Sequence, residues 1–269
     1  MITLEDTFAD IIGKAIRGLR LPDAQVAGSA GIELGALEAL RAGHWEPVAA
    51  AKVAPVLGLG VAALAGIGSG GWSPAAVAIE GLAQFNTPYE DMAVNAYLVW
   101  DPATGEAAAF DTGADASGML SLAAEKQLRI TQIFLTHTHG DHIFDLDRLK
   151  EKTGARVYVG AREPLDGVES FEAGAAFQIG GLQIATRLTW GHSVGGITYV
   201  VTGLAQPLAI VGDAIYAGSM GGGGVSYEAA LETNRSQILS LAGETIIAPG
   251  HGPLTTVAEQ RVSNPFFAA

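Results

Sequence analysis

Three histidines and an aspartate with metal-binding side chains fall within six residues, in the stretch THTHGDH at positions 136–142. The stretch follows the apolar run QIFL, which is typical of a buried strand. Residues two apart at the end of an extended segment point the same way, so His137 and His139 can hold one cation together. Asp141 and His142, after a turn at Gly140, face a second cation. Imidazole and carboxylate suit zinc, iron or manganese, so the pattern predicts a metal site.

Three more metal-binding side chains each follow a predicted strand. His192 lies in GHSVGG after the segment 182–190, Asp213 ends AIVGD, and His251 lies in APGHGP. Taken singly, each of these residues has the alternative explanation of an ordinary turn. Together, at the ends of strands, they are expected to meet the first cluster at one edge of the sheets.

Composition limits the kind of protein that carries these residues. The chain has 269 residues, 49% of them hydrophobic, with 28 acids, 15 Lys and Arg and no cysteine. The hydrophobic content excludes a disordered chain, and the lack of cysteine excludes disulfides and a thiolate nucleophile. A net charge of −13 argues against a broad nucleic-acid-binding face. The acidic start differs from a secretory signal, and the apolar stretch 53–68 is shorter than the roughly 20 residues that span a bilayer. We expect a cytoplasmic protein without a membrane partner.

The order of elements predicts an α/β fold in two parts. Residues before about 75 show helical spacing of apolar side chains, and a flexible composition follows at 68–71. The predicted strands are 93–100, 130–137, 156–160, 182–190, 196–201, 207–213 and 245–250. The stretch DPATGE at 101–106 is expected to be a hairpin turn between the first of these strands and AAAFDTG. We therefore predict a helical domain at 1–75 and a domain of sheets covered by helices at 76–269.

The THTHGDH stretch, with the later His, Asp and His, resembles the signature of the metallo-β-lactamase superfamily of metal-dependent hydrolases. The resemblance implies an αββα sandwich, here preceded by a small all-α domain. It also implies that two divalent metal ions, zinc in the first place and iron or manganese as alternatives, hold a bridging hydroxide as nucleophile. The implied ligands are His137, His139 and His192 for the first metal, Asp141, His142 and His251 for the second, and Asp213 for both.

The same resemblance gives two further residues a role, and makes Asp141 and Asp213 part of the catalytic machinery. Asp111, in FDTG, matches the upstream acid of the family and is expected to orient a ligand, with a hairpin or cap aspartate as the alternative. Tyr216 could donate a hydrogen bond to the substrate oxyanion, unless it is merely a packed tyrosine. The nearby glycine-rich stretch at 217–226 is expected to be a mobile loop at the pocket mouth.

The spacings of 50, 21 and 38 residues from His142 through His192 and Asp213 to His251 are similar to those of glyoxalase II-type thioesterases and of the related persulfide dioxygenases. The closing run PGHGPLTTVAEQRVSNPFF looks like the short bacterial enzymes of this type, which lack the domain that grips glutathione. We therefore expect a small-molecule thioester or related activated ester as substrate, with or without glutathione.

Two alternatives remain open. A mononuclear iron dioxygenase of the persulfide type would use only His137, His192 and Asp213. A regulator would combine a metabolite-sensing metal domain with a DNA-binding helical domain, because residues 5 to 68 resemble a phage-repressor type of helix-turn-helix. The second helix of that motif has Glu33, Glu38 and a single arginine, so we favour a packing or dimerising module over a nucleic-acid partner.

Overall fold

The computed structural model describes residues 2–268, and its first part is helical. The helices are α1 (Phe8–Leu19), α2 (Asp23–Ala30), α3 (Leu34–Arg41), α4 (Pro47–Val56) and α5 (Val61–Gly68). Helix α1 begins at a capping box, in which Thr7 and Asp10 satisfy each other's backbone N–H groups. Its apolar side chains lie on one face and are buried against the other helices and the sheet domain.

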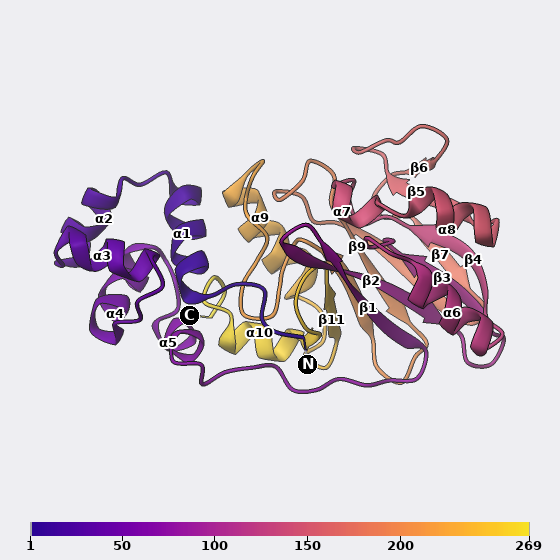
Figure 1. Ribbon diagram of the computed structural model, residues 1–269, viewed down its shortest axis with the longest axis horizontal. Helices are drawn as coiled ribbons and strands as arrows, with labels where there is room; N and C mark the ends of the chain where they lie inside the picture. The colour runs from indigo at the N-terminus through magenta and orange to yellow at the C-terminus, as the bar shows by residue number, and fades with distance from the viewer. Residues whose placement is uncertain (1, 269) are drawn as a thin grey trace.

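Two six-stranded sheets form the second part (Figure 1). The first sheet has β1 (Leu82–Tyr89), β2 (Met92–Trp100), β3 (Glu106–Phe110), β4 (Arg129–Phe134), β5 (Arg156–Gly160) and β6 (Glu169–Phe171), in that order. The second has β12 (Thr255–Thr256), β11 (Ile246–Pro249), β10 (Leu208–Gly212), β9 (Ile197–Thr202), β8 (Leu182–Leu188) and β7 (Ala176–Ile179). The seven strands predicted from the sequence are all present, with their ends shifted by a few residues, and β3 is the second strand of the predicted hairpin. Strands β1, β6, β7 and β12 were not predicted.

Helices cover the outer faces of both sheets and complete the predicted αββα sandwich. They are α6 (Ser117–Glu125), α7 (Gly140–Ile143), α8 (Leu146–Thr153), α9 (Tyr227–Thr233), which continues into a π-helical turn at Asn234–Ile238, and α10 (Val257–Ser263). Phe110 and Phe134 of the first sheet meet Tyr199 of the second in the buried layer between them. Met119 and Leu149 pack on the outer face of the first sheet, and Val257 packs on that of the second.

The helical part packs against the end of the second sheet where α9 and α10 lie (Figure 1). One apolar core joins Ile11, Ile12 and Leu64 to Met220 and Phe266 of the sheet domain. Within residues 2–268 no helix is both long and apolar enough to cross a membrane.

Candidate metal centre

The sandwich brings all seven predicted ligand side chains to one edge. The segment after β4 carries His137 and His139 and continues into α7, which carries Asp141 and His142. Asp213 directly follows β10, and His251 lies two residues after β11. Because β10 and β11 are parallel neighbours, their carboxyl ends meet at the same edge of the sheet. The loop after β8 adds His192.

Four side chains form a first group, His137, His139, His192 and Asp213. His139 Nδ1 lies 3.0 Å from His137 Nε2 and 3.1 Å from His192 Nε2. These spacings are close to the edge of a tetrahedron around a metal bound at about 2.05 Å, which is about 3.3 Å. His139 is exposed, so this group opens toward solvent.

Asp141, His142 and His251 form the second group. Asp141 Oδ2 lies 3.5 Å from His142 Nε2 and 3.3 Å from His251 Nε2. The two imidazoles of this group are buried, so it lies deeper than the first.

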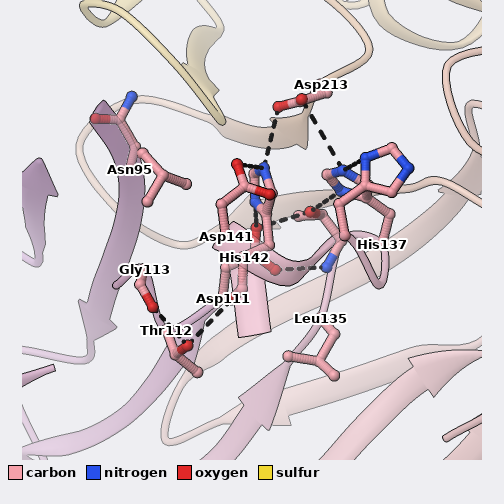
Figure 2. Close-up of polar contacts among 12 residues, drawn as sticks. Asn95, Asp111, Thr112, Gly113, Leu135, His137, Asp141, His142 and Asp213 are labelled. Carbon is pink, nitrogen blue, oxygen red and sulfur yellow. Dashed lines mark hydrogen bonds and ion pairs between the residues drawn. The ribbon is translucent and has the colours of Figure 1, made fainter. Parts of the chain in front are cut away.

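Asp213 lies between the groups and contacts both. Its Oδ2 is 3.3 Å from His192 Nε2 and 3.5 Å from His251 Nε2, and its Oδ1 is 3.2 Å from His142 Nε2. Figure 2 shows Asp213 facing His142 and His137, with Asp111 on the other side of His142. This is the arrangement expected of a carboxylate that bridges two cations.

The donor atoms fit a metal pair. His142 Nε2 and Asp213 Oδ1 are buried and have no hydrogen-bond partner within residues 2–268, although they face each other. Buried polar atoms normally have hydrogen-bond partners, so two potential ligand atoms that face only each other at 3.2 Å fit a cation site.

Hydrogen bonds on the far side of the imidazoles leave each Nε2 free for a metal. His142 Nδ1 donates to Asp111 Oδ2 (2.8 Å), His251 Nδ1 to the Ala93 carbonyl (2.7 Å) and His192 Nδ1 to the Gly222 carbonyl (3.1 Å). Such partners fix the tautomer and the orientation of a ligand ring. The structure thus places Asp111 where it can orient a ligand.

Asp111, which is placed to orient His142, has an uncommon backbone conformation. Its φ is 55°, in the left-handed region, and its carboxylate also accepts hydrogen bonds from the backbone N–H and hydroxyl of Thr136, each at 2.7 Å. Since Thr136 Oγ1 donates to Asp111, it can accept from His137 Nδ1, which lies 3.0 Å away. Asp111 therefore connects to a ligand of each group.

Because Gly250 has no side chain, it leaves space for the ligand side chains beside it. A Cβ atom at this position would lie 2.1 Å from Asp213 Oδ1 and 2.6 Å from His142 Cε1. Any larger residue would displace one ligand of each group, which explains a glycine directly before His251.

The charges of the site act strongly on one another. Burial alone would raise the pKa of Asp213, but the neighbouring His142 and His251 outweigh it and hold the pKa well below its usual range. Burial lowers the pKa of His142, and Asp213 and Asp111 overcome this and raise it to about 10. His251 behaves likewise, since Asp213 and Asp141 raise its pKa to about 11 against the effect of burial.

Glu163 positions two ligand-bearing loops and was missed by sequence reasoning. Its Oε2 accepts hydrogen bonds from the backbone N–H (2.7 Å) and hydroxyl (2.9 Å) of Thr138, between His137 and His139. Its Oε1 accepts from the backbone N–H of Gly195 (2.8 Å), three residues after His192. Glu163 is buried, and only the folded chain shows these partners.

Asn95 on β2 holds the turn around His251 and was likewise missed. Its Nδ2 donates to the carbonyls of Pro249 (2.9 Å) and Gly252 (2.8 Å), and its side chain is fully buried. A single asparagine within an apolar strand carries no motif, although its polarity in an otherwise buried strand was a usable signal.

Tyr216 is buried beside the centre, and its ring centroid lies 5.7 Å from that of His251. Burial, and then the charge of Asp213, raises the pKa of Tyr216 well above its usual value, so its hydroxyl remains a donor. The expectation of a mobile loop after it is wrong for residues 217–221. These residues are buried, because Gln260 and Asn264 of the C-terminal segment hydrogen-bond to Gly218 and Ser219.

The sequence profile of the metallo-beta-lactamase superfamily matches residues 89–251, which include Asp111 and all seven ligand candidates. The chain belongs to the metallo-beta-lactamase superfamily. The superfamily, the two-sheet fold and the His/Asp cluster together identify a metallo-hydrolase with a metal-binding centre of the dinuclear type.

Known proteins are similar to part of the chain. The probable metallo-hydrolase YqgX of Bacillus subtilis is 31% identical over 181 residues, which are 58% of this chain and 85% of the relative. A hydroxyacylglutathione hydrolase of Cereibacter sphaeroides is 33% identical over 161 residues, 58% of this chain and 61% of the relative. The crystal structure of TTHA1623 in a di-iron-bound form superposes with a TM-score of 0.56 at 26% identity, covering 68% of this chain and 99% of that one.

Proposed function

We propose that the protein hydrolyses a thioester or a related activated ester. The proposal rests on the position of Asp213 between the two groups of imidazoles. His142 contacts its Oδ1, and His192 and His251 contact its Oδ2. A carboxylate so placed can hold two cations at once.

In this proposal His137, His139 and His192 hold the first metal, Asp141, His142 and His251 hold the second, and Asp213 holds both. Zinc is the proposed metal, with iron or manganese as alternatives. When bound, two divalent cations lower the pKa of a water held between them and polarise the substrate carbonyl.

The chain's own residues supply access and hydrogen bonding. The exposed side of His139 provides the approach to the first group. The protonated hydroxyl of Tyr216, beside His251, is a candidate donor to the oxyanion that forms on the carbonyl oxygen when the carbonyl carbon is attacked. A thiolate leaves without a strong general acid, which suits a site whose acids are occupied as ligands.

The likeness to a hydroxyacylglutathione hydrolase supports a thioester as substrate. A mononuclear dioxygenase would use only His137, His192 and Asp213. It would leave the second group, Asp141, His142 and His251, without a metal, although one ligand atom of each lies within 4.8 Å of the others, and this grouping supports the dinuclear proposal.

The test is metal analysis of the purified protein, followed by thiol release from a panel of thioesters that includes a hydroxyacylglutathione. We expect two metal ions per chain and release of thiol from at least one thioester. Asp213→Ala should lose both turnover and bound metal, whereas Asp147→Ala, on the exposed surface of α8, should keep both. One iron per chain with oxygen uptake, or unchanged turnover in Asp213→Ala, would contradict the proposal.

A further inference from the structure

The loop between Asp213 and α9 approaches the metal centre at two points. It begins directly after Asp213, and its residue Gly222 accepts the hydrogen bond from His192 Nδ1 at 3.1 Å. The position of this one loop therefore affects His192 of the first group and Asp213, which contacts both groups.

The N-terminal segment holds the middle of this loop. Lys14 Nζ, on α1, donates a hydrogen bond to the Met220 carbonyl at 2.8 Å. Asp6 forms an ion pair with Lys14 and accepts a hydrogen bond from the Ser219 hydroxyl. Two adjacent loop residues are thus fixed by two charged side chains from a part of the chain more than 200 residues away.

These contacts lie in a mostly buried environment, where a charged or polar group needs a hydrogen-bond partner. The side chains of Lys14 and Asp6 are only 15% and 8% exposed. A mostly buried charge that loses its partner is costly, so the loop is held to the geometry that satisfies both charges. Lys14 Nζ also lies 5.1 Å from the ring centroid of Tyr216, which packs on His251.

Apolar packing supports the same contact. Met220 is 1% exposed and belongs to the core that α1 forms with Phe8, Ile11 and Ile12. Gly18 of α1 lies against Tyr227, where a Cβ atom would come within 2.3 Å of the ring. The first turn of α9 and the loop before it therefore pack against α1.

We propose that the N-terminal helical segment is a support of the metal centre, and that Lys14 and Asp6 are positioning residues for His192 and for the loop that follows Asp213. This role rests on the proposed metal assignment. It differs from that of a separate DNA-binding or dimerising module, because the segment acts through contacts with the ligand-bearing loop.

The test compares Lys14→Met with Lys14→Arg and Lys52→Met. Lys14→Met keeps an unbranched side chain one atom shorter but loses the charge, and Lys14→Arg keeps a cation that can donate to the same partners. Lys52 is the matched control, because its Nζ contacts a backbone carbonyl of the same helical segment, that of Gly31, but not the loop. The readouts are metal affinity by competition with a chelator and the visible absorption of the cobalt(II) form, with the thermal transition recorded in parallel.

We expect Lys14→Met to bind metal about 10- to 100-fold more weakly and to change the cobalt spectrum. Lys14→Arg should restore both, and Lys52→Met should match the wild type. A lower melting temperature with unchanged affinity and spectrum would overturn the proposal, because that is the result of a contact that only stabilises the fold. Should Lys14→Met fail to fold, Ser219→Ala removes one bond of the same network and must show the same loss of affinity. A wild-type protein that binds no metal would instead overturn the proposed function.

Discussion

Asp111 accepts a hydrogen bond from His142 at 2.8 Å while its own backbone is held at φ 55°. Strained conformations of this kind persist where the surrounding structure requires them. Here the requirement is that one carboxylate reaches both His142 and Thr136, and so connects with both groups of ligands.

Asp111→Asn separates the charge of this residue from its backbone conformation, because asparagine also tolerates the left-handed region. The amide removes the negative charge and one acceptor oxygen, so His142 loses its preferred tautomer. We expect metal affinity to fall about 10- to 100-fold, measured by chelator competition. Asp115→Asn, on an exposed aspartate four residues further on, should leave the affinity unchanged. Equal affinities of the two variants would show that Asp111 does not orient His142.

Glu163→Gln tests the link between the two ligand-bearing loops. Glutamine keeps the shape but has one acceptor oxygen, so its NH₂ group must face the backbone N–H of either Thr138 or Gly195. We expect looser binding of the metal at the first group and a lower kcat, with metal content and turnover as readouts. Glu172→Gln, at an exposed position, is the control and should behave like the wild type.

Gly250→Ala tests the close approach of the backbone to the ligands. The added methyl group would occupy the space of Asp213 Oδ1 and His142 Cε1, so we expect most of the bound metal and activity to be lost. In Gly243→Ala the new Cβ meets Ala258 at an ordinary 3.5 Å, and metal content should remain. Full metal content in Gly250→Ala would mean that the ligands lie elsewhere.

Metal binding should release protons, because the pKa values of His142 and His251 are raised to about 10 and about 11. At pH 7.5 both imidazoles of chelator-stripped protein therefore carry a proton that a metal must displace. We expect at least two protons released per chain, and an affinity that rises with pH toward about 10. Calorimetric titration in buffers of different ionisation enthalpy measures this number. Release of no protons would contradict the raised pKa values.

The sequence predicted the site best where metal-binding residue types directly follow a predicted strand. THTHGDH puts four ligand candidates on one turn after a strand, and the later three candidates stand directly after predicted strands, so their meeting at one edge could be anticipated. The seven predicted strands are rich in apolar residues. The missed strands β6 and β12 have only three and two residues, too few to show a period.

The supporting residues could not be predicted in the same way. Glu163, Asn95 and Lys14 are single polar residues without a motif, and their partners lie far away in the chain. The apolar spacing of the N-terminal helices predicted that they pack, but only the folded chain shows Met220 and Phe266 in their core.

That common core also bears on how the protein unfolds. Since α1 and α5 bury side chains together with Met220 and Phe266, neither half can melt without exposing apolar surface of the other. Heating should therefore give a single cooperative transition, and the flexible composition at 68–71 acts as a tether between parts of one folding unit rather than as a hinge.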